Sequence, residues 1–139
     1  MLQIELVNWN EAREKASSIR FTVFVEEQRV PVEIEWDEQD AKSLHALAYA
    51  GSGEAIATGR LLPDGHVGRM AVLKAWRGRG VGGALLERLI AAARERGDTE
   101  IELFAQTHAL EFYRRHGFVE RGEIFEEAGI PHQAMRRAL

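Results

Sequence analysis

The sequence predicts a single α/β domain in which a twisted, mostly antiparallel sheet with mixed strand directions is flanked by helices. Strand-like segments separated by short turns fill the middle of the chain, and two other segments have the apolar period of amphipathic helices. No linker, internal repeat or low-complexity stretch divides the 139 residues. Because a chain of this length can bury one core without disulfides or metals, we expect one domain over residues 1–139.

The first elements are a strand and a helix. Residues 2–8 alternate in the manner of a strand, and Asn8 with Glu11 three positions later has the spacing of a helix N-cap and capping box. Pro31 ends any helix that reaches it. The apolar stripe of this helix consists of Ala12, Ala16, Ile19 and Val23.

An acidic segment follows over residues 26–40. Arg29 is its one basic residue, and its acids are Glu26, Glu27, Glu33, Glu35, Asp37, Glu38 and Asp40. We interpret the segment as a solvated face, with a surface that attracts a cationic substrate as the alternative.

Three consecutive strands are predicted over Leu44–Ala50, Ala55–Leu62 and Val67–Val72. Glycine-rich and proline-containing turns at residues 51–53 and 63–65 separate them, so the middle of the chain is an antiparallel meander.

The second half of the chain begins with a helix that starts at residue 81 and stops at Gly97. A strand over Ile101–Gln106 and a short helix over residues 108–116 follow it. Two last strands are expected around Phe118–Ile124 and Gln133–Ala138.

Composition excludes several classes of protein. A formal net charge of -4 disfavours general nucleic-acid binding, and the absence of cysteine excludes disulfides, thiolate metal sites and a cysteine nucleophile. The histidines lack compact metal-ligand spacing, so we expect no metal. The charged start and the lack of a long apolar run argue against a secretory signal or a membrane span, and we expect a cytoplasmic protein.

The run Arg77-Gly78-Arg79-Gly80-Val81-Gly82-Gly83 is the strongest functional signal. Glycines let a ligand approach main-chain N–H groups closely, and the helix that follows begins with unsatisfied N–H groups and a positive dipole end. This combination predicts a site for a diphosphate.

Three other interpretations of the glycine run were weighed. Gly78, Gly80 and Gly83 satisfy G-x-G-x-x-G, but residues 73–76 separate them from the preceding strand and the context is a meander rather than repeated βαβ units. A Walker A loop is excluded because Gly83 is not followed by Lys and Ser or Thr. A glycine-rich loop without a ligand is disfavoured, because such a loop costs backbone entropy and packs little.

The segment Arg69-Met70-Ala71-Val72, the glycine run and the later Phe112-Tyr113-Arg114-Arg115-His116-Gly117-Phe118 together resemble the GNAT superfamily of acetyl-CoA-dependent N-acetyltransferases. The stretch Arg20–Gln28, then Asp37, Asp40, His45 and residues 129–132, is similar to the small bacterial ElaA/YjcF-type branch.

The resemblance implies a GNAT-like fold and a cofactor site for acetyl-CoA. It implies that Met70–Val72 pairs with the pantetheine arm, that the Val72 N–H forms an oxyanion hole, and that Tyr113 is the general acid. A phenol with a reference pKa near 10 suits that role, with a packed core tyrosine as the alternative. The implied coenzyme-binding residues are Met70, Ala71, Val72, Arg77, Gly78, Arg79, Gly80, Val81, Gly82 and Gly83.

The attacking amine is mostly protonated at neutral pH, so a base must accept its proton directly or through water. Glu27 is our candidate, because the acidic segment lies where the family forms part of its acceptor site. The alternatives are Glu102, His66, His108 and His132.

The sequence therefore predicts transfer of acetyl from acetyl-CoA to a primary amine, with a small molecule as the acceptor. A non-catalytic acyl-CoA sensor and a protein that binds NAD(H) are the alternatives. The oligomeric state is open, with a homodimer among the choices.

Overall fold

The computed structural model describes residues 2–35 and 37–139 and contains two antiparallel sheets. The first has the order β1-β2-β3-β4 and the second the order β5-β7-β6. The strands of the first sheet are β1 (Gln3–Val7), β2 (Leu44–Tyr49), β3 (Ala55–Leu61) and β4 (Val67–Val72). Those of the second are β5 (Glu100–Gln106), β6 (Val119–Glu127) and β7 (Ile130–Ala138). The α/β fold class and the antiparallel meander are confirmed.

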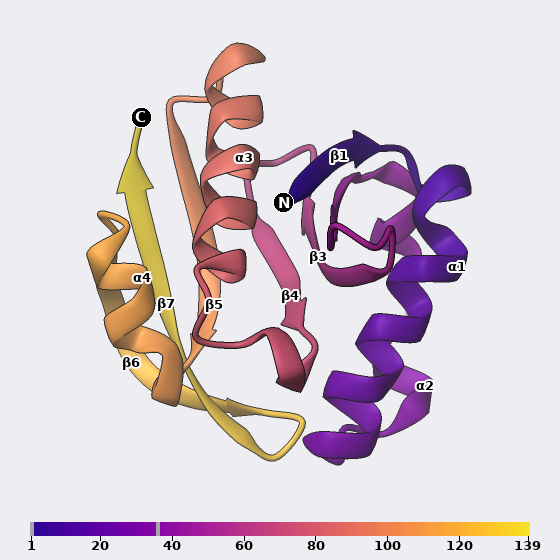
Figure 1. Ribbon diagram of the computed structural model, residues 1–139. Helices are drawn as coiled ribbons and strands as arrows, with labels where there is room; N and C mark the ends of the chain where they lie inside the picture. The colour runs from indigo at the N-terminus through magenta and orange to yellow at the C-terminus, as the bar shows by residue number, and fades with distance from the viewer. Residues whose placement is uncertain (1, 36) are drawn as a thin grey trace.

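The two sheets meet at one point and then separate. An isolated parallel bridge joins His66 to Glu102, and the Glu102 N–H donates to the carbonyl of Gly65 at 3.1 Å. Beyond this bridge β4 and β5 run apart, which Figure 1 shows below α3. Mixed strand direction is thus confined to this bridge among the described residues.

The N-terminal helix differs from the prediction at its C-terminal end. Asn8 caps α1 (Trp9–Arg20) as predicted, accepting a hydrogen bond from the Glu11 N–H at 3.0 Å. The chain then widens into a π-helix, η1 (Phe21–Glu27), and makes a short helix α2 (Val32–Glu35) after Pro31. A 3₁₀ segment, η2 (Glu38–Lys42), leads into β2. π-Helices are rare and concentrate at functional sites, so η1 indicates that the functional site lies at this end of the molecule.

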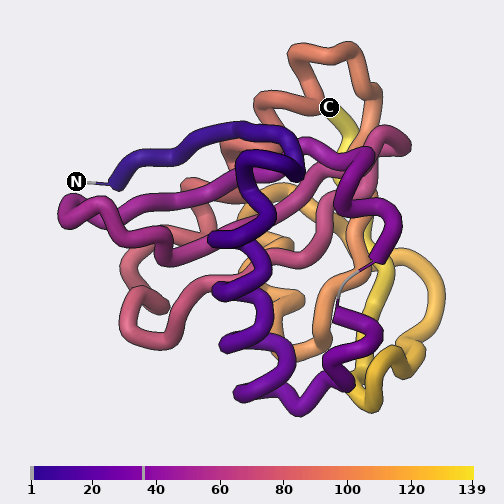
Figure 2. Tube along the Cα trace, turned by 90° about the vertical axis from the view of Figure 1, so that its right-hand side faces the viewer, coloured from indigo at the N-terminus to yellow at the C-terminus, as the bar shows by residue number. Residues whose placement is uncertain are grey.

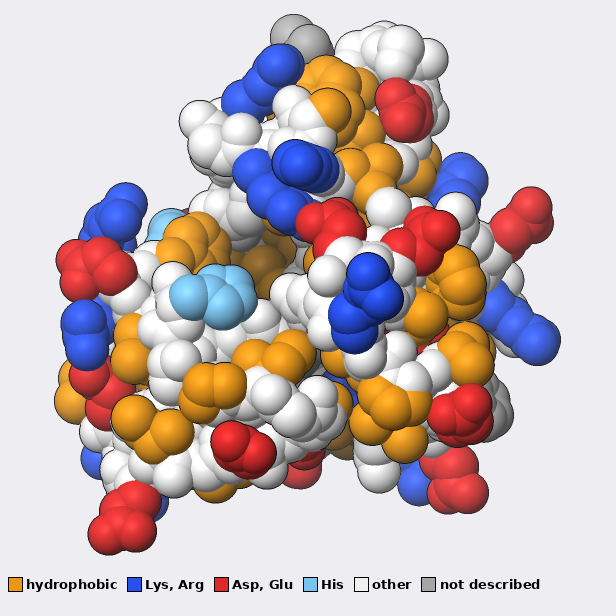
Figure 3. Space-filling view, turned by 90° about the horizontal axis from the view of Figure 1, so that it is seen from below, with side chains coloured by type: hydrophobic (Ala, Val, Ile, Leu, Met, Phe, Trp, Pro, Cys, Tyr) orange, Lys and Arg blue, Asp and Glu red, His pale blue; other side chains and the backbone are white. Residues whose placement is uncertain are grey.

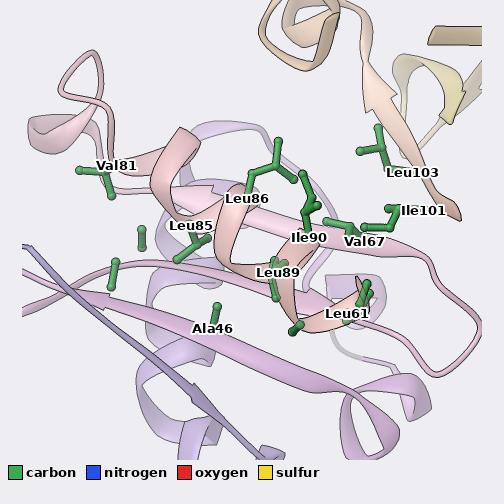
Figure 4. Close-up of a cluster of buried hydrophobic side chains, with 14 of the residues drawn as sticks. Ala46, Leu61, Val67, Val81, Leu85, Leu86, Leu89, Ile90, Ile101 and Leu103 are labelled. Atoms are coloured by element: carbon green, nitrogen blue, oxygen red, sulfur yellow. The ribbon is translucent and has the colours of Figure 1, made fainter. Parts of the chain in front are cut away.

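Helices cover both faces of the first sheet. In Figure 2, α1 lies in front of the strands, where its apolar stripe packs against Leu47 and Ala71. Helix α3 (Val81–Glu95) covers the opposite face and reaches both sheets; Figure 4 shows Ile90 of α3 beside Val67 of β4 and Ile101 of β5. The core therefore fixes the position of the α3 N-terminus relative to the gap between the sheets.

The C-terminal elements agree with the sequence in order but differ in length. The predicted helix over 108–116 is a 3₁₀ turn, η4 (Thr107–Ala109), followed by α4 (Leu110–Arg115). The final hairpin of β6 and β7 is longer than predicted, and it extends toward the open end of the gap.

The interpretation of the acidic segment as a solvated face is wrong for its C-terminal part, at Glu35, Asp37 and Asp40. Arg20 is 1% exposed, and its guanidinium bonds both Glu35 and Asp40, the latter at 2.8 Å. Arg60 of β3 bonds Asp40 at 2.9 Å and Asp37 at 2.7 Å. The network could not be predicted from residues 26–40 alone, because its cations, Arg20 and Arg60, come from α1 and β3. Exposed acids of the segment are Glu26, Glu27, Glu33 and Glu38.

Candidate active site

A cleft of about 1460 Å³ occupies the gap where β4 and β5 separate. One wall, the helix side, comes from the loop before α3, the first turn of α3, and α4 with its C-cap. Its residues are Trp76, Arg77, Gly78, Gly80, Val81, Gly82, Gly83, Phe112, Tyr113, Arg115 and His116. The other wall, the open side, consists of residues from η1, β5 and the β6–β7 hairpin, including Phe24, Gln28, Phe104, Gln106 and His132. Seen from below in Figure 3, this face is hollowed, with hydrophobic and histidine side chains around the hollow.

The glycine run forms the N-terminus of α3 at the cleft. Gly80 is the N-cap with a left-handed φ of 81°, and its carbonyl accepts the Ala84 N–H at 3.1 Å. The N–H groups of Val81, Gly82 and Gly83 precede the first intrahelical hydrogen bond, and all three residues line the cleft. No acidic residue lies in the first turn. The site thus offers donors and a positive dipole end to an anion.

The two arginines of the run have different positions. The Arg79 guanidinium lies over the Trp76 ring, 4.9 Å from its centroid, and Arg79 does not line the cleft. Arg77 lines it, donating from Nε to the Val72 carbonyl at 2.9 Å and from Nη2 to Glu27 Oε1 at 2.9 Å. Arg77 therefore ties the glycine loop to β4 and to η1.

The last residues of β4 present main-chain groups to the cleft. The Leu73 N–H donates to Ile56 of the neighbouring strand at 2.9 Å, so alternation along the strand turns the N–H and carbonyl of Val72 away from β3, toward the gap. The register between β3 and β4 shifts next to Arg69, which has a positive φ of 48°. Bulges of this kind redirect side chains beside functional sites. Met70, Ala71 and Val72 all line the cleft.

Tyr113 of α4 lies on the helix side of the cleft. Its ring packs edge-on against Phe112 and Phe118, with centroids 5.0 and 5.9 Å away. Among the described residues nothing hydrogen bonds its hydroxyl. Burial raises the pKa of Tyr113 to about 12, so the phenol keeps its proton throughout the neutral range.

The candidate bases have different surroundings. Glu27 does not line the cleft, and its carboxylate accepts the hydrogen bond from Arg77. Glu102 also lies outside the lining; it bonds Arg121 at 2.9 Å and lies 3.3 Å from His66 Nε2. The three histidines line the cleft: His66 next to Asp64, His108 next to Gln106, and His132 in the final hairpin.

Two amides join separate segments within the open side. Gln28, directly after η1, and Gln106 of β5 exchange hydrogen bonds at 2.9 and 3.2 Å, although they are far apart in the sequence. His108 Nε2 lies 2.6 Å from Gln106 Oε1. Sequence reasoning missed this pair, because neither glutamine has a local signal that distinguishes it from a surface residue.

The ionic network forms the floor of the open side, because Glu35, Arg60 and Arg69 line the cleft. Burial alone raises the pKa of the Asp40 carboxyl, but hydrogen bonds and positive charge from Arg20 and Arg60 outweigh burial and hold that pKa below its usual value. Asp40 is therefore a fixed negative charge at neutral pH. One indirect sign of this network is visible in the sequence, an acidic run whose one basic residue is Arg29.

Within residues 2–35 and 37–139, no group of three or more histidine, cysteine, aspartate or glutamate side chains is placed to hold a metal ion. None of the helices described has the length and apolar character needed to cross a membrane.

Comparison with known proteins gives consistent matches. The profile described as the acetyltransferase (GNAT) domain matches residues 11–139. The N-acetyltransferase YjcF of Bacillus subtilis is 41% identical over 86% of this chain and 87% of its own length. The crystal structure of an acyl-CoA N-acyltransferase from Pseudomonas aeruginosa has a TM-score of 0.88 and 32% identity, covering 99% of this chain and 100% of that one. The crystal structure of Escherichia coli ElaA has a TM-score of 0.87 and 28% identity, covering 99% of each chain.

Proposed function

This chain belongs to the GNAT family of acetyltransferases, and we propose that it moves acetyl from acetyl-CoA to the primary amine of a small molecule. The family and its resemblance to YjcF and ElaA are as the sequence predicted. The chain is an N-acetyltransferase with an acyl-CoA as donor. The nature of the acyl group, the acceptor and the residue roles below are our proposals.

One observation carries the proposal: the N-terminus of α3 opens into the cleft with the unpaired N–H groups of Val81, Gly82 and Gly83. A diphosphate there gains several hydrogen bonds and the favourable end of the helix dipole. In our proposal the pantetheine arm of a coenzyme held at this point runs along β4, whose residues Met70, Ala71 and Val72 line the same cleft.

The reaction requires an electrophile held in place and a proton for the departing thiol. In our proposal the Val72 N–H, which faces the gap, donates to the thioester oxygen and stabilises the charge that develops there. Tyr113 then protonates the sulfur of coenzyme A as the carbon–sulfur bond breaks. Its pKa of about 12 keeps the proton available, and Val72 and Tyr113 both line the cleft.

Two measurements test the function. Calorimetry should show binding of acetyl-CoA to the folded protein, and an amine panel should reveal acceptors by release of free thiol. Binding without turnover for any amine would favour the sensor alternative, and NAD(H) binding without coenzyme A binding would favour the dinucleotide alternative.

Replacing Gly80 by alanine should weaken acetyl-CoA binding by about tenfold. A left-handed φ costs an L-residue about 1–2 kcal/mol, and relief of this strain would turn the first N–H groups of α3 away from their common target. Calorimetric titration of the variant measures the effect.

The matched control is Gly53→Ala. Gly53 has a φ of 91° and Gly80 a φ of 81°, and an added Cβ would meet nothing within 4 Å at either position. Gly53, however, lies in the turn between β2 and β3, away from the cleft. We expect similar strain with unchanged coenzyme affinity. Equal affinity in the Gly80 variant and the wild type would argue against the loop as the diphosphate site.

A further inference from the structure

We propose that His132 is the general base that takes the proton from the acceptor amine. This inference rests on the proposed acetyl transfer and replaces Glu27, whose carboxylate is engaged by Arg77 outside the cleft lining.

The hydrogen bonding of the His132 ring fixes its tautomer. Nδ1 lies 2.7 Å from the carbonyl oxygen of Ile130, and a carbonyl only accepts, so Nδ1 carries the hydrogen. In the neutral ring Nε2 then carries the basic lone pair. No hydrogen bond among the described residues engages this nitrogen.

The Nε2 nitrogen of this ring is not sealed from solvent, although the ring is mostly buried. His132 is 7% exposed and lines the cleft. Among the described residues, Arg60 Nε is the one side-chain nitrogen or oxygen that is both sealed from solvent and without a partner. His132 Nε2 also has no partner there, so it must reach open space, and we infer that this space is the cleft.

The sheet places His132 on the open side. In β7 it pairs with Gln106 of β5 and Phe125 of β6, and its ring stacks on Phe125 with centroids 5.8 Å apart. The neighbouring residues Leu103 and Met135 belong to the buried core with α3, whereas the His132 ring lies with the exposed rings of Phe104 and Phe125. An amine approaching from the open side thus meets His132 on the way to the coenzyme.

The other candidates are engaged or exposed. Both ring nitrogens of His66 face carboxylates, Asp64 at 3.0 Å and Glu102 at 3.3 Å. His108 is exposed to solvent and bonded to Gln106.

The charged and titratable groups around His132 come from each neighbouring element. Glu102 of β5 is bonded to Arg121 of β6, His108 follows β5, and Glu127 of β6 lines the same cleft. Arg136, farther along β7, pairs with Glu100 at 3.3 Å. Glu102 and Arg136 are each paired with a group of opposite charge. The test must therefore distinguish the effect of His132 from those of His108 and Glu127.

The proton transfers balance as follows. The ammonium gives one proton to His132 Nε2, which later releases it to water, and the free amine forms a bond to the acyl carbon. When the carbon–sulfur bond breaks, Tyr113 gives its proton to the sulfur, and the phenolate recovers a proton from the acylated nitrogen. The sum is ammonium plus acetyl-CoA giving the amide, coenzyme A thiol and one proton.

The test uses His132→Gln with two acceptors, propylamine, which is an ammonium ion at neutral pH, and methoxyamine, which is neutral there. Loss of a general base typically lowers the rate about 10²-fold or more. We expect that loss in kcat for propylamine. In the pH profile of kcat/KM, the acid limb should disappear, and the rate should instead rise toward alkaline pH as the amine loses its own proton. Turnover of methoxyamine should be nearly unchanged, because it needs no base for its first proton.

Two controls separate base catalysis from a structural effect. His66→Gln, His108→Gln and Glu127→Gln should each keep the acid limb, and calorimetric affinity of His132→Gln for acetyl-CoA should equal that of the wild type. Equal loss with both amines, or a retained acid limb in His132→Gln, would overturn the assignment. Failure of the wild type to release thiol with any amine would instead refute the proposed function.

Discussion

Replacing Arg20 by methionine is expected to lower the free energy of unfolding by about 3–5 kcal/mol, the usual cost of removing one partner from a buried ion pair. Glu35 and Asp40, which are 8% and 0% exposed, would lose the guanidinium that bonds them both. Arg60 alone would then face Asp40, and its own Nε already has no partner. Because folded domains are stable by about 5–15 kcal/mol, the loss should be visible as a large shift in urea midpoint.

The control for this substitution is Arg136→Met. Arg136 pairs with Glu100 at 3.3 Å, with both side chains about half exposed, and such pairs contribute at most about 1 kcal/mol. Urea unfolding of the two variants compares the same chemical change in buried and exposed settings. Similar midpoints for both would show that the buried network is not a major source of stability.

The network links stability to the site. Arg69 donates to the carbonyl of Glu35 at 3.1 Å and to Asp37 at 3.1 Å, so the segment after η1 is attached to the bulge of β4. Glu35, Arg60 and Arg69 line the cleft. A variant that loosens this segment therefore changes the floor of the acceptor side, and substrate affinity should fall along with stability.

Local signals were sufficient to predict the frame of the molecule. The turns between β2, β3 and β4 contain glycine or proline, and Asn8 caps α1 as its spacing indicated. The glycine run was informative for the same reason: left-handed φ at Gly78 and Gly80 is a local backbone requirement that sequence displays directly.

The features that sequence reasoning missed depend on contacts between distant segments. Arg20 is buried because its partners, Glu35 and Asp40, lie 15 and 20 residues farther along the chain. No residue next to Arg20 in the sequence indicates this burial. The exchange between Gln28 and Gln106 likewise joins segments that are far apart in the sequence. Nothing in a local window reports which side chains the packing of η1 against β5 will bring together.

Replacing Tyr113 by phenylalanine is expected to lower kcat by about 10²–10⁴-fold, the range typical of a lost general acid. The ring contacts with Phe112 and Phe118 remain, so acetyl-CoA affinity measured by calorimetry should stay close to that of the wild type. The raised pKa sets the pH dependence: a phenol of ordinary pKa, near 10, would be half ionised at pH of about 10, whereas Tyr113 would remain protonated there. The wild-type rate should therefore not fall through phenol ionisation until the pH approaches about 12.

Tyr49→Phe provides the matched control, because Tyr49 is the other tyrosine of the chain. Its hydroxyl lies 3.0 Å from Lys15 Nζ on the face of the first sheet covered by α1, away from the cleft. This variant should keep the turnover of the wild type, and ultraviolet titration of the two variants should assign the higher-titrating phenol to Tyr113. Equal loss of turnover and coenzyme affinity in Tyr113→Phe would identify the residue as a packing element. A normal rate with intact affinity would mean that departure of the thiol does not need the proton of Tyr113.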